Sequence, residues 1–167
     1  MSAAVTHLNT ATDGVKAAVP VVILLALAYS LSALSKTMGT ANYIVSFAQQ
    51  FLSPRMLPFV IFVIAAIMAF ATGTSWGTFA ICMPIALPLA FNYTEGRLTP
   101  LVMACFAAVA GGGVFGDHCS PLSETTVLSS AGAAADHIDH VKTQLPYALV
   151  CAAVASIAYL IVGFMMV

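Results

Sequence analysis

Long apolar segments dominate this sequence and leave it too few charged side chains to cover a globular surface in water. Of its 167 residues, 61% are hydrophobic and only 7% are charged, and the mean hydropathy is +1.01. A soluble domain usually carries about a quarter charged residues. We therefore predict an all-α integral membrane protein that is surrounded by a lipid bilayer. The net charge of −1 indicates no nucleic-acid partner.

The apolar residues fall into four blocks, of which the two central ones are interrupted by polar residues. The blocks cover residues 17–34, 56–91, 100–135 and 146–167. The first block nearly spans a bilayer core of about 30 Å. The first fifteen residues contain no Lys or Arg, whereas a secretory signal begins with a positively charged stretch. We therefore expect a retained membrane helix there. The last block is expected to form a helix that follows a polar loop over residues 136–144.

The first interruption is TGTSWGT, Thr72–Thr78, inside the block 56–91. As a single helix this block would be about 54 Å long, too long for one untilted crossing, so a hairpin with its tip in the interruption is favoured. Irregular backbone at membrane depth survives only where protein or a watery cavity surrounds it. Unwound carbonyls and the hydroxyls of Thr74, Ser75 and Thr78 are oxygen ligands that suit a small cation such as sodium. A simple helix kink is the structural alternative.

The second interruption is GDHCSPLSETT, Gly116–Thr126. The preceding run GGGVFG is expected to loosen the helix, and Pro121 suits the first turn of a new one. Ser120 is then the expected N-cap, and Glu124 would lie near the positive end of the new helix. Capping would account for much of this polar stretch, including Ser123.

Capping does not account for Asp117 and His118. A carboxylate at bilayer depth is costly unless it is paired, hydrated or protonated. At the end of a broken helix, Asp117 would face free carbonyl oxygens, and a cation or a proton would relieve their repulsion. This pattern predicts a sodium site at Asp117 in which sodium and a proton compete. His118 could relay protons, because imidazole titrates near neutral pH, but we favour a role in orienting Asp117 by a hydrogen bond.

Both interruptions resemble segments of one known family. FATGTSWGTFAICMPIA and GGGVFGDHCSPLSETTVLSSAGAAADHIDHVKTQLPYAL are similar to segments of the NhaC-type sodium/proton antiporters. Members of that family are several hundred residues long, so the resemblance is to the C-terminal half only. It implies one inverted-repeat half of an ion-transporter fold, with both interruptions as re-entrant or discontinuous helices. It also implies a bacterial inner membrane location and a partner, either the missing N-terminal half or another copy. The family pattern usually has Asp where this chain has Glu124.

We therefore expect secondary active transport, with sodium moving one way and protons the other by alternating access. No covalent step and no cofactor are implied, so an enzyme is not expected. The candidate ion- and proton-binding residues all carry oxygen or imidazole groups in the two interruptions. They are Asp117, Glu124, His118, Thr74, Ser75, Thr78, Ser120, Ser123 and Thr125.

Three alternatives stay open at this point. The family resemblance includes carriers that exchange malate with lactate, so a sodium- or proton-coupled organic anion exchanger is one of them. A truncated membrane subunit that is inactive without a partner half is another. The third is a metal-binding membrane protein that uses His118, Cys119, His137 and His140. Adjacent residues seldom converge on one metal, and zinc ligands are normally spaced by two or more.

Overall fold

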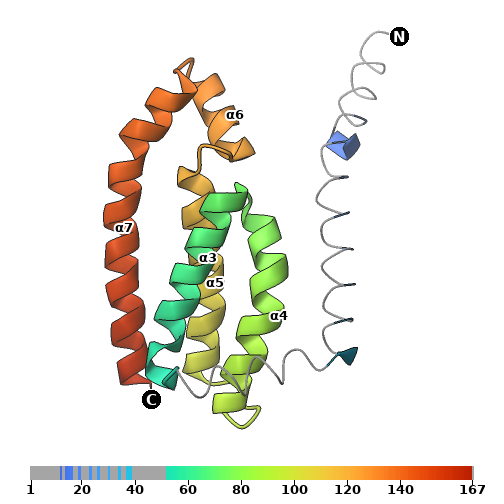
Figure 1. The fold of residues 1–167 in the computed structure, drawn as a ribbon, viewed down its shortest axis with the longest axis vertical. Helices are drawn as coiled ribbons and strands as arrows, with labels where there is room; N and C mark the ends of the chain where they lie inside the picture. Colours follow the sequence, from blue (N-terminus) through green and yellow to red (C-terminus); the bar gives the residue numbers. More distant parts are fainter. Residues whose placement is uncertain are drawn as a thin grey trace.

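The computed structural model describes residues 52–166 and scattered positions between residues 12 and 38. The predicted first helix, 17–34, lies largely outside these residues. Within 52–166 the chain forms helices and no strand, which confirms the predicted all-α class for this part (Figure 1). The elements in chain order are η1 (Pro54–Met56), α3 (Leu57–Thr72), α4 (Ser75–Tyr93), α5 (Pro100–Cys119), α6 (Glu124–Gly132) and α7 (His137–Met165).

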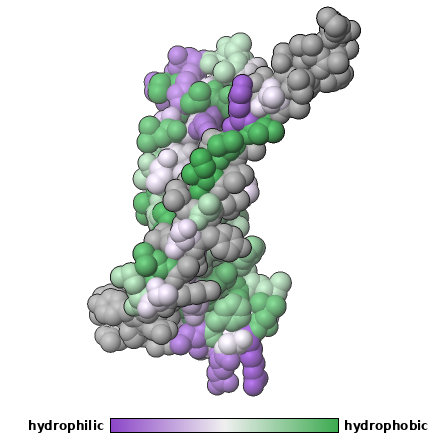
Figure 2. All heavy atoms as spheres, turned by 90° about the vertical axis from the view of Figure 1, so that its right-hand side faces the viewer, coloured by the Kyte–Doolittle hydropathy of each residue, from purple (hydrophilic) through white to green (hydrophobic). Residues whose placement is uncertain are grey.

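Four helices of the described part are long and apolar enough to cross a membrane. They cover Pro54–Thr72, Ser75–Tyr93, Pro100–Cys119 and His137–Met165. On the face drawn in Figure 2, hydrophilic residues gather towards the two ends of the molecule and hydrophobic residues lie between them. Large apolar side chains such as Tyr147, Val150 and Val154 are exposed on α7. Because lipid solvates such side chains and water does not, this surface suits an integral membrane protein.

α3 and α4 form a helical hairpin whose tip is the first interruption (Figure 1). Gly73 ends α3 in the left-handed conformation with φ +69°, which a glycine adopts without steric cost. Thr74 is extended, and α4 begins at Ser75. The unwound part is therefore only two residues long. Each arm is long enough to cross a membrane by itself, whether or not the pair is re-entrant.

α5 is continuous through the glycine run, contrary to our expectation that GGGVFG would loosen it. These glycines instead allow close packing against α3. A methyl group at Gly112 would lie 2.5 Å from the carbonyl oxygen of Phe62, and one at Gly116 would collide with the carbonyl oxygen of Ala66. Small residues four positions apart commonly bring membrane helices into such backbone contact. The run thus stabilises the α3–α5 pair, and the chain leaves the helix only after Cys119.

The second interruption differs in detail from the prediction. Ser120 follows the last residue of α5, and the next helix starts at Glu124 with Ser123 as its N-cap. The Ser123 hydroxyl accepts a hydrogen bond from the backbone N–H of Thr125 at 3.2 Å. The predicted cap at Ser120 was therefore wrong by one turn. Pro121 lies in the turn between the helices, where its missing N–H costs nothing.

α7 begins at His137 and includes most of the segment that we expected to be a polar loop, 136–144. Asp136 caps it, because its carboxylate accepts hydrogen bonds from the N–H groups of Ile138 and Asp139 at 2.9 and 3.1 Å. A capped N-terminus explains why helix propagates into this polar sequence. At its other end α7 contacts η1, since a methyl group at Gly163 would collide with the carbonyl oxygen of Arg55.

Candidate functional site

The two interruptions touch each other at one end of the helix bundle. A methyl group at Gly73 would lie 2.7 Å from the carbonyl carbon of Leu122 and 3.0 Å from the backbone nitrogen of Ser123. The Ser120 hydroxyl donates a hydrogen bond to the carbonyl oxygen of Phe70 in the last turn of α3, at 2.7 Å. These contacts join residues about fifty positions apart. The sequence motifs that stood out separately therefore form one site.

Asp117 is the buried carboxylate of this site. It lies in the last turn of α5 and only 8% of its surface is exposed. The hydroxyl of Ser123, which is fully buried, donates to its Oδ1 at 2.6 Å. The short distance is typical of a hydrogen bond between a hydroxyl and a charged or strongly polar oxygen. The carboxylate is thus fixed by the N-cap residue of the next helix.

Ser123 also connects Asp117 to a second hydroxyl. Its Oγ lies 2.7 Å from Oγ1 of Thr125, and Thr125 is exposed. Oxygen atoms of three residues therefore follow one another from a buried carboxylate to the surface. Sequence reasoning proposed all three as separate oxygen donors, and the structure brings them into one chain of hydrogen bonds.

Carbonyl oxygens at the end of α5 are satisfied by a residue that the sequence analysis did not single out. The Thr126 hydroxyl lies 3.1 Å from the carbonyl oxygen of His118 and 3.5 Å from that of Asp117. Thr126 is buried and occupies the inner face of α6. Thr126 follows Ser123 by three residues, about one helical turn, and this spacing could have indicated that both side chains lie on the same face.

The hydroxyls of the first interruption serve mainly the start of α4. Thr74 caps this helix by accepting from the N–H of Gly77 at 3.4 Å. The buried Thr78 donates to the carbonyl oxygen of Thr74 at 2.9 Å. Ser75 is the first residue of α4 and is partly buried. These residues line the hairpin tip that contacts the second interruption, and their hydrogen bonds are made within α4.

His118 does not orient Asp117 by the hydrogen bond that we favoured. Its side chain is exposed, and its ring nitrogens lie 2.6 and 3.2 Å from the amide nitrogen of Gln144 on α7. The hydroxyl of Ser123 takes the predicted role instead. Gln144 was missed by sequence reasoning, because contacts between α5 and α7 have no local sequence signal.

Glu124 is exposed and is the first residue of α6. A carboxylate in the first turn stabilises a helix through the partial positive charge of its N-terminus. This position supports the capping interpretation of Glu124 more than the ion-binding one.

The metal-site alternative finds no support in the described residues, which contain no group of three His, Cys, Asp or Glu side chains that could hold a metal ion. His137 contacts the carbonyl oxygen of Pro121 at 2.8 Å and the hydroxyl of Ser130 at 3.3 Å. The buried thiol of Cys119 donates to the carbonyl oxygen of Phe115 at 3.1 Å. His137 thus holds the α5–α6 connection against the start of α7.

Comparison with known proteins identifies the chain's family. The model of the Na+/H+ antiporter family matches residues 3–164. An uncharacterized protein of Haemophilus influenzae is 46% identical over 151 residues, which are 90% of this chain and 28% of that protein. The malate-2H(+)/Na(+)-lactate antiporter of Bacillus subtilis is 34% identical over 127 residues, 76% of this chain and 26% of that protein. The Na(+)/H(+) antiporter NhaC of Alkalihalophilus pseudofirmus is 27% identical over 151 residues, 90% of this chain and 32% of NhaC.

The chain thus spans between about a quarter and a third of the length of these relatives. No solved structure matches it. The family match covers both interruptions and the four apolar helices that hold them, and it confirms the resemblance to NhaC-type proteins. This chain, whose two polar interruptions meet around a buried carboxylate, belongs to the Na+/H+ antiporter family.

Proposed function

We propose that this chain forms part of the ion-binding centre of a secondary antiporter that exchanges sodium for protons across a bacterial inner membrane. Asp117 is the carboxylate that the two ions share. The observation that carries the proposal is the burial of this side chain where the two interruptions meet.

The surroundings of Asp117 favour a bound cation or proton. It lies in the last turn of α5, where the aligned peptide dipoles give the helix end a partial negative charge. A buried carboxylate there costs free energy unless a positive charge offsets it. Because sodium and a proton would occupy the same oxygen atoms, each excludes the other. Exchange follows once the site faces the two sides of the membrane in turn.

The hydroxyls of the site are not equally suited to bind the cation. Those of Ser120 and Thr78 donate to the carbonyl oxygens of Phe70 and Thr74, so they support the backbone first. Ser123 bonds directly to the carboxylate of Asp117, whereas Thr125 bonds to Ser123. We infer that Ser123 contributes its oxygen atom to the cation before the other hydroxyls, and that Thr125, Glu124 and His118 do not bind the cation.

The complete exchanger requires more protein than this chain. The relatives are three to four times as long as the part that the chain matches. We infer that the chain binds the ion by itself, and that a partner half, either further sequence or a second copy of the chain, is needed for alternating access. Chemistry of this kind requires no cofactor and forms no covalent intermediate.

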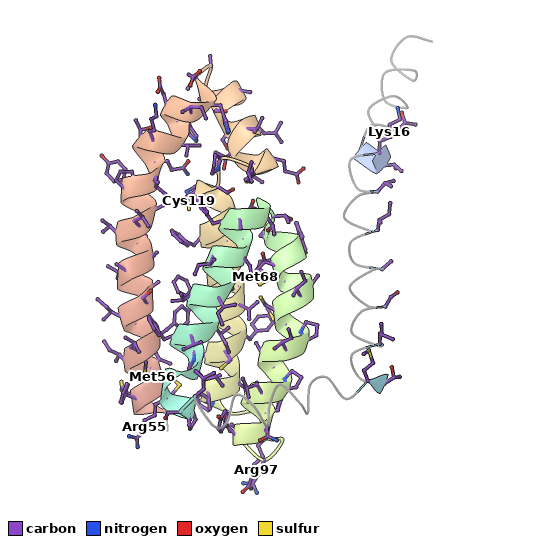
Figure 3. The ribbon with its side chains drawn as sticks, viewed as in Figure 1. Lys16, Arg55, Met56, Met68, Arg97 and Cys119 are labelled. Atoms are coloured by element: carbon purple, nitrogen blue, oxygen red, sulfur yellow. The ribbon has the colours of Figure 1, made fainter. Side chains whose placement is uncertain are left out.

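An organic anion exchanger is the second candidate, because a relative that is 34% identical is a malate/lactate antiporter. A substrate carboxylate would need donors near the first turn of α6. Neither interruption contains Lys or Arg, and Arg55 and Arg97 lie at the opposite end of the bundle from Cys119, the last residue of α5 (Figure 3). Lys142 on α7 is exposed and lies 3.7 Å from the carboxylate of Asp139. The inorganic cation is therefore the better-supported substrate.

The test is sodium-linked proton release from the purified chain in lipid nanodiscs. Addition of sodium to weakly buffered protein should release protons, and addition of malate or lactate should not. Asp117→Asn keeps the shape of the side chain and can still accept from Ser123, so it should fold but release none. Glu124→Gln is the matched control and should behave as the unchanged protein does. Release that persists in Asp117→Asn contradicts the proposal.

A further inference from the structure

We propose that the protons exchanged at Asp117 travel through the hydroxyls of Ser123 and Thr125 to water at the start of α6. This inference rests on the proposed function, since it adds a route to the site described above. Its basis is an unbroken series of short contacts. Ser123 Oγ lies 2.6 Å from Asp117 Oδ1 and 2.7 Å from Thr125 Oγ1.

Exposure shows which end of the series meets water. Asp117 is 8% exposed and Ser123 is completely buried, whereas Thr125 is exposed. Thr125 is therefore the group that meets water. Among the described residues, the hydroxyl of Ser123 joins Thr125 to the carboxylate of Asp117. The other titratable neighbours lie off this route. His118 contacts Gln144 on α7, and Glu124 is exposed at the first position of α6.

The hydrogen bonds can run in either direction along the series. When Asp117 is ionised, Ser123 uses its only hydroxyl proton to donate to the carboxylate, so the hydroxyl of Thr125 must donate to Ser123. When Asp117 is protonated and donates to Ser123, both hydroxyls turn, and Thr125 donates to water. The series therefore has one arrangement for each state of the carboxyl group.

Proton release converts the second arrangement into the first. Each hydroxyl gains one proton as it loses another, so neither carries a lasting charge. The proton of the Asp117 carboxyl group moves to Ser123 Oγ while the proton of Ser123 moves to Thr125 Oγ1. The proton of Thr125 moves to water. One O–H bond breaks and one forms at each hydroxyl oxygen. The net change is one proton lost by Asp117 and one gained by water.

Helix capping explains only part of this geometry. As an N-cap, Ser123 needs its oxygen lone pair to accept from the N–H of Thr125 at 3.2 Å. The cap does not require the proton of Ser123 or the hydroxyl of Thr125. Those are the two features that the proposed route uses, so capping and relay are compatible in one residue.

The experiment is a rapid sodium jump on the whole chain in nanodiscs, followed with a pH-sensitive dye. Thr125→Val replaces the hydroxyl with a methyl group of similar size, which also excludes a substituting water. Its equilibrium proton release should equal that of the unchanged protein. Its release rate should fall about 100-fold, the lower end of what a positioned proton-transfer group contributes. Thr125→Ser should restore the rate.

Thr143→Val is the matched control, because Thr143 is an exposed threonine near the start of α7 whose hydroxyl bonds within its own helix. It should leave the rate unchanged. An unchanged rate in Thr125→Val overturns the route, while the function stands if Asp117→Asn still abolishes release. Absence of sodium-linked release from the unchanged protein, by contrast, contradicts the proposed function.

Discussion

Gly73 and Leu122 lie backbone against backbone, with room for no side chain between them. A methyl group at Gly73 would approach the carbonyl carbon and oxygen of Leu122 to 2.7 and 2.8 Å. This contact joins the tip of the α3–α4 hairpin to the α5–α6 connection. It fixes the segment that carries Ser123 relative to the first interruption.

We predict that Gly73→Ala destabilises the chain and loosens the site. The left-handed backbone costs an alanine about 1–2 kcal/mol, and the collision with Leu122 adds about 1–3 kcal/mol of overpacking. Gly96→Ala separates these costs, because Gly96 also has a positive φ (+77°) but nothing within 4 Å of an added methyl group. Thermal unfolding in detergent, followed with a thiol-reactive dye on the buried cysteines, measures both. Equal losses in the two variants would show that the contact contributes nothing.

Gly116→Ala should also lower the unfolding temperature, for a different reason. Its backbone is helical, but an added methyl group would meet the carbonyl oxygen of Ala66 and lie 2.6 Å from the backbone nitrogen of Phe70. α5 would have to move away from α3, at a cost of about 1–3 kcal/mol. Gly132→Ala in α6 meets nothing within 4 Å and should be neutral or slightly stabilising. An unchanged unfolding temperature in Gly116→Ala would contradict the close packing of these helices.

Ser120→Ala should weaken the connection between the two interruptions. It removes the donor to the partly buried Phe70 carbonyl oxygen at 2.7 Å, and the loss of such a hydrogen bond costs about 1 kcal/mol. We expect faster amide hydrogen exchange at residues 120–126 than in the unchanged chain. Thr143→Val, which loses only an exposed bond within α7, is the comparison. Unaltered exchange at 120–126 would show that this hydrogen bond does not hold the segment.

His118→Gln should leave sodium-linked proton release nearly unchanged. The imidazole contacts Gln144 and not the carboxylate of Asp117, so its removal alters the α5–α7 contact and leaves Ser123 in place. The same sodium-jump assay checks this result. A loss of release as complete as that of Asp117→Asn would restore a role for His118 at the site, either the orienting role that the sequence favoured or a proton relay.

The membrane class, the helical architecture and the polar residues of the site were predictable from the sequence. The low charge content and the apolar blocks required a membrane protein, and a buried Asp117 was the group that capping did not explain. The helix break within Thr72–Thr78 was predicted correctly, and Gly73 ends α3 there because its backbone preference acts locally. Pro121 marked the interruption after α5, but it lies in the turn and not in the first turn of α6 as expected.

Features that depend on contacts between helices were not predictable. The glycine-rich sequence Gly111–Gly116 predicts a loosened helix when considered alone. It is helical because Gly112 and Gly116 pack against small residues of α3, namely Ala65, Ala66 and Ala69. α6 starts at Glu124 with Ser123 as its N-cap, while Ser120 accepts from the N–H of Leu122 and donates to Phe70 on another helix. The partner of His118 is likewise supplied by α7. In each case tertiary contacts overrode local preference.

The close packing of α3 on α5 has a consequence for the path of an ion through the membrane. With glycines 112 and 116 in backbone contact with α3, no hydrated cation can pass along this seam. A cavity of about 320 Å³ between α3, α5 and α7 is lined by apolar side chains such as Phe70, Phe115 and Leu149, which offer an ion no oxygen atoms. Neither region offers an ion a polar path to the buried Asp117, whereas the hydroxyls of Ser123 and Thr125 lead from it to the surface at the start of α6. If Asp117 exchanges ions as we propose, access from the opposite side of the membrane would run along a surface that further sequence or a second copy of the chain completes.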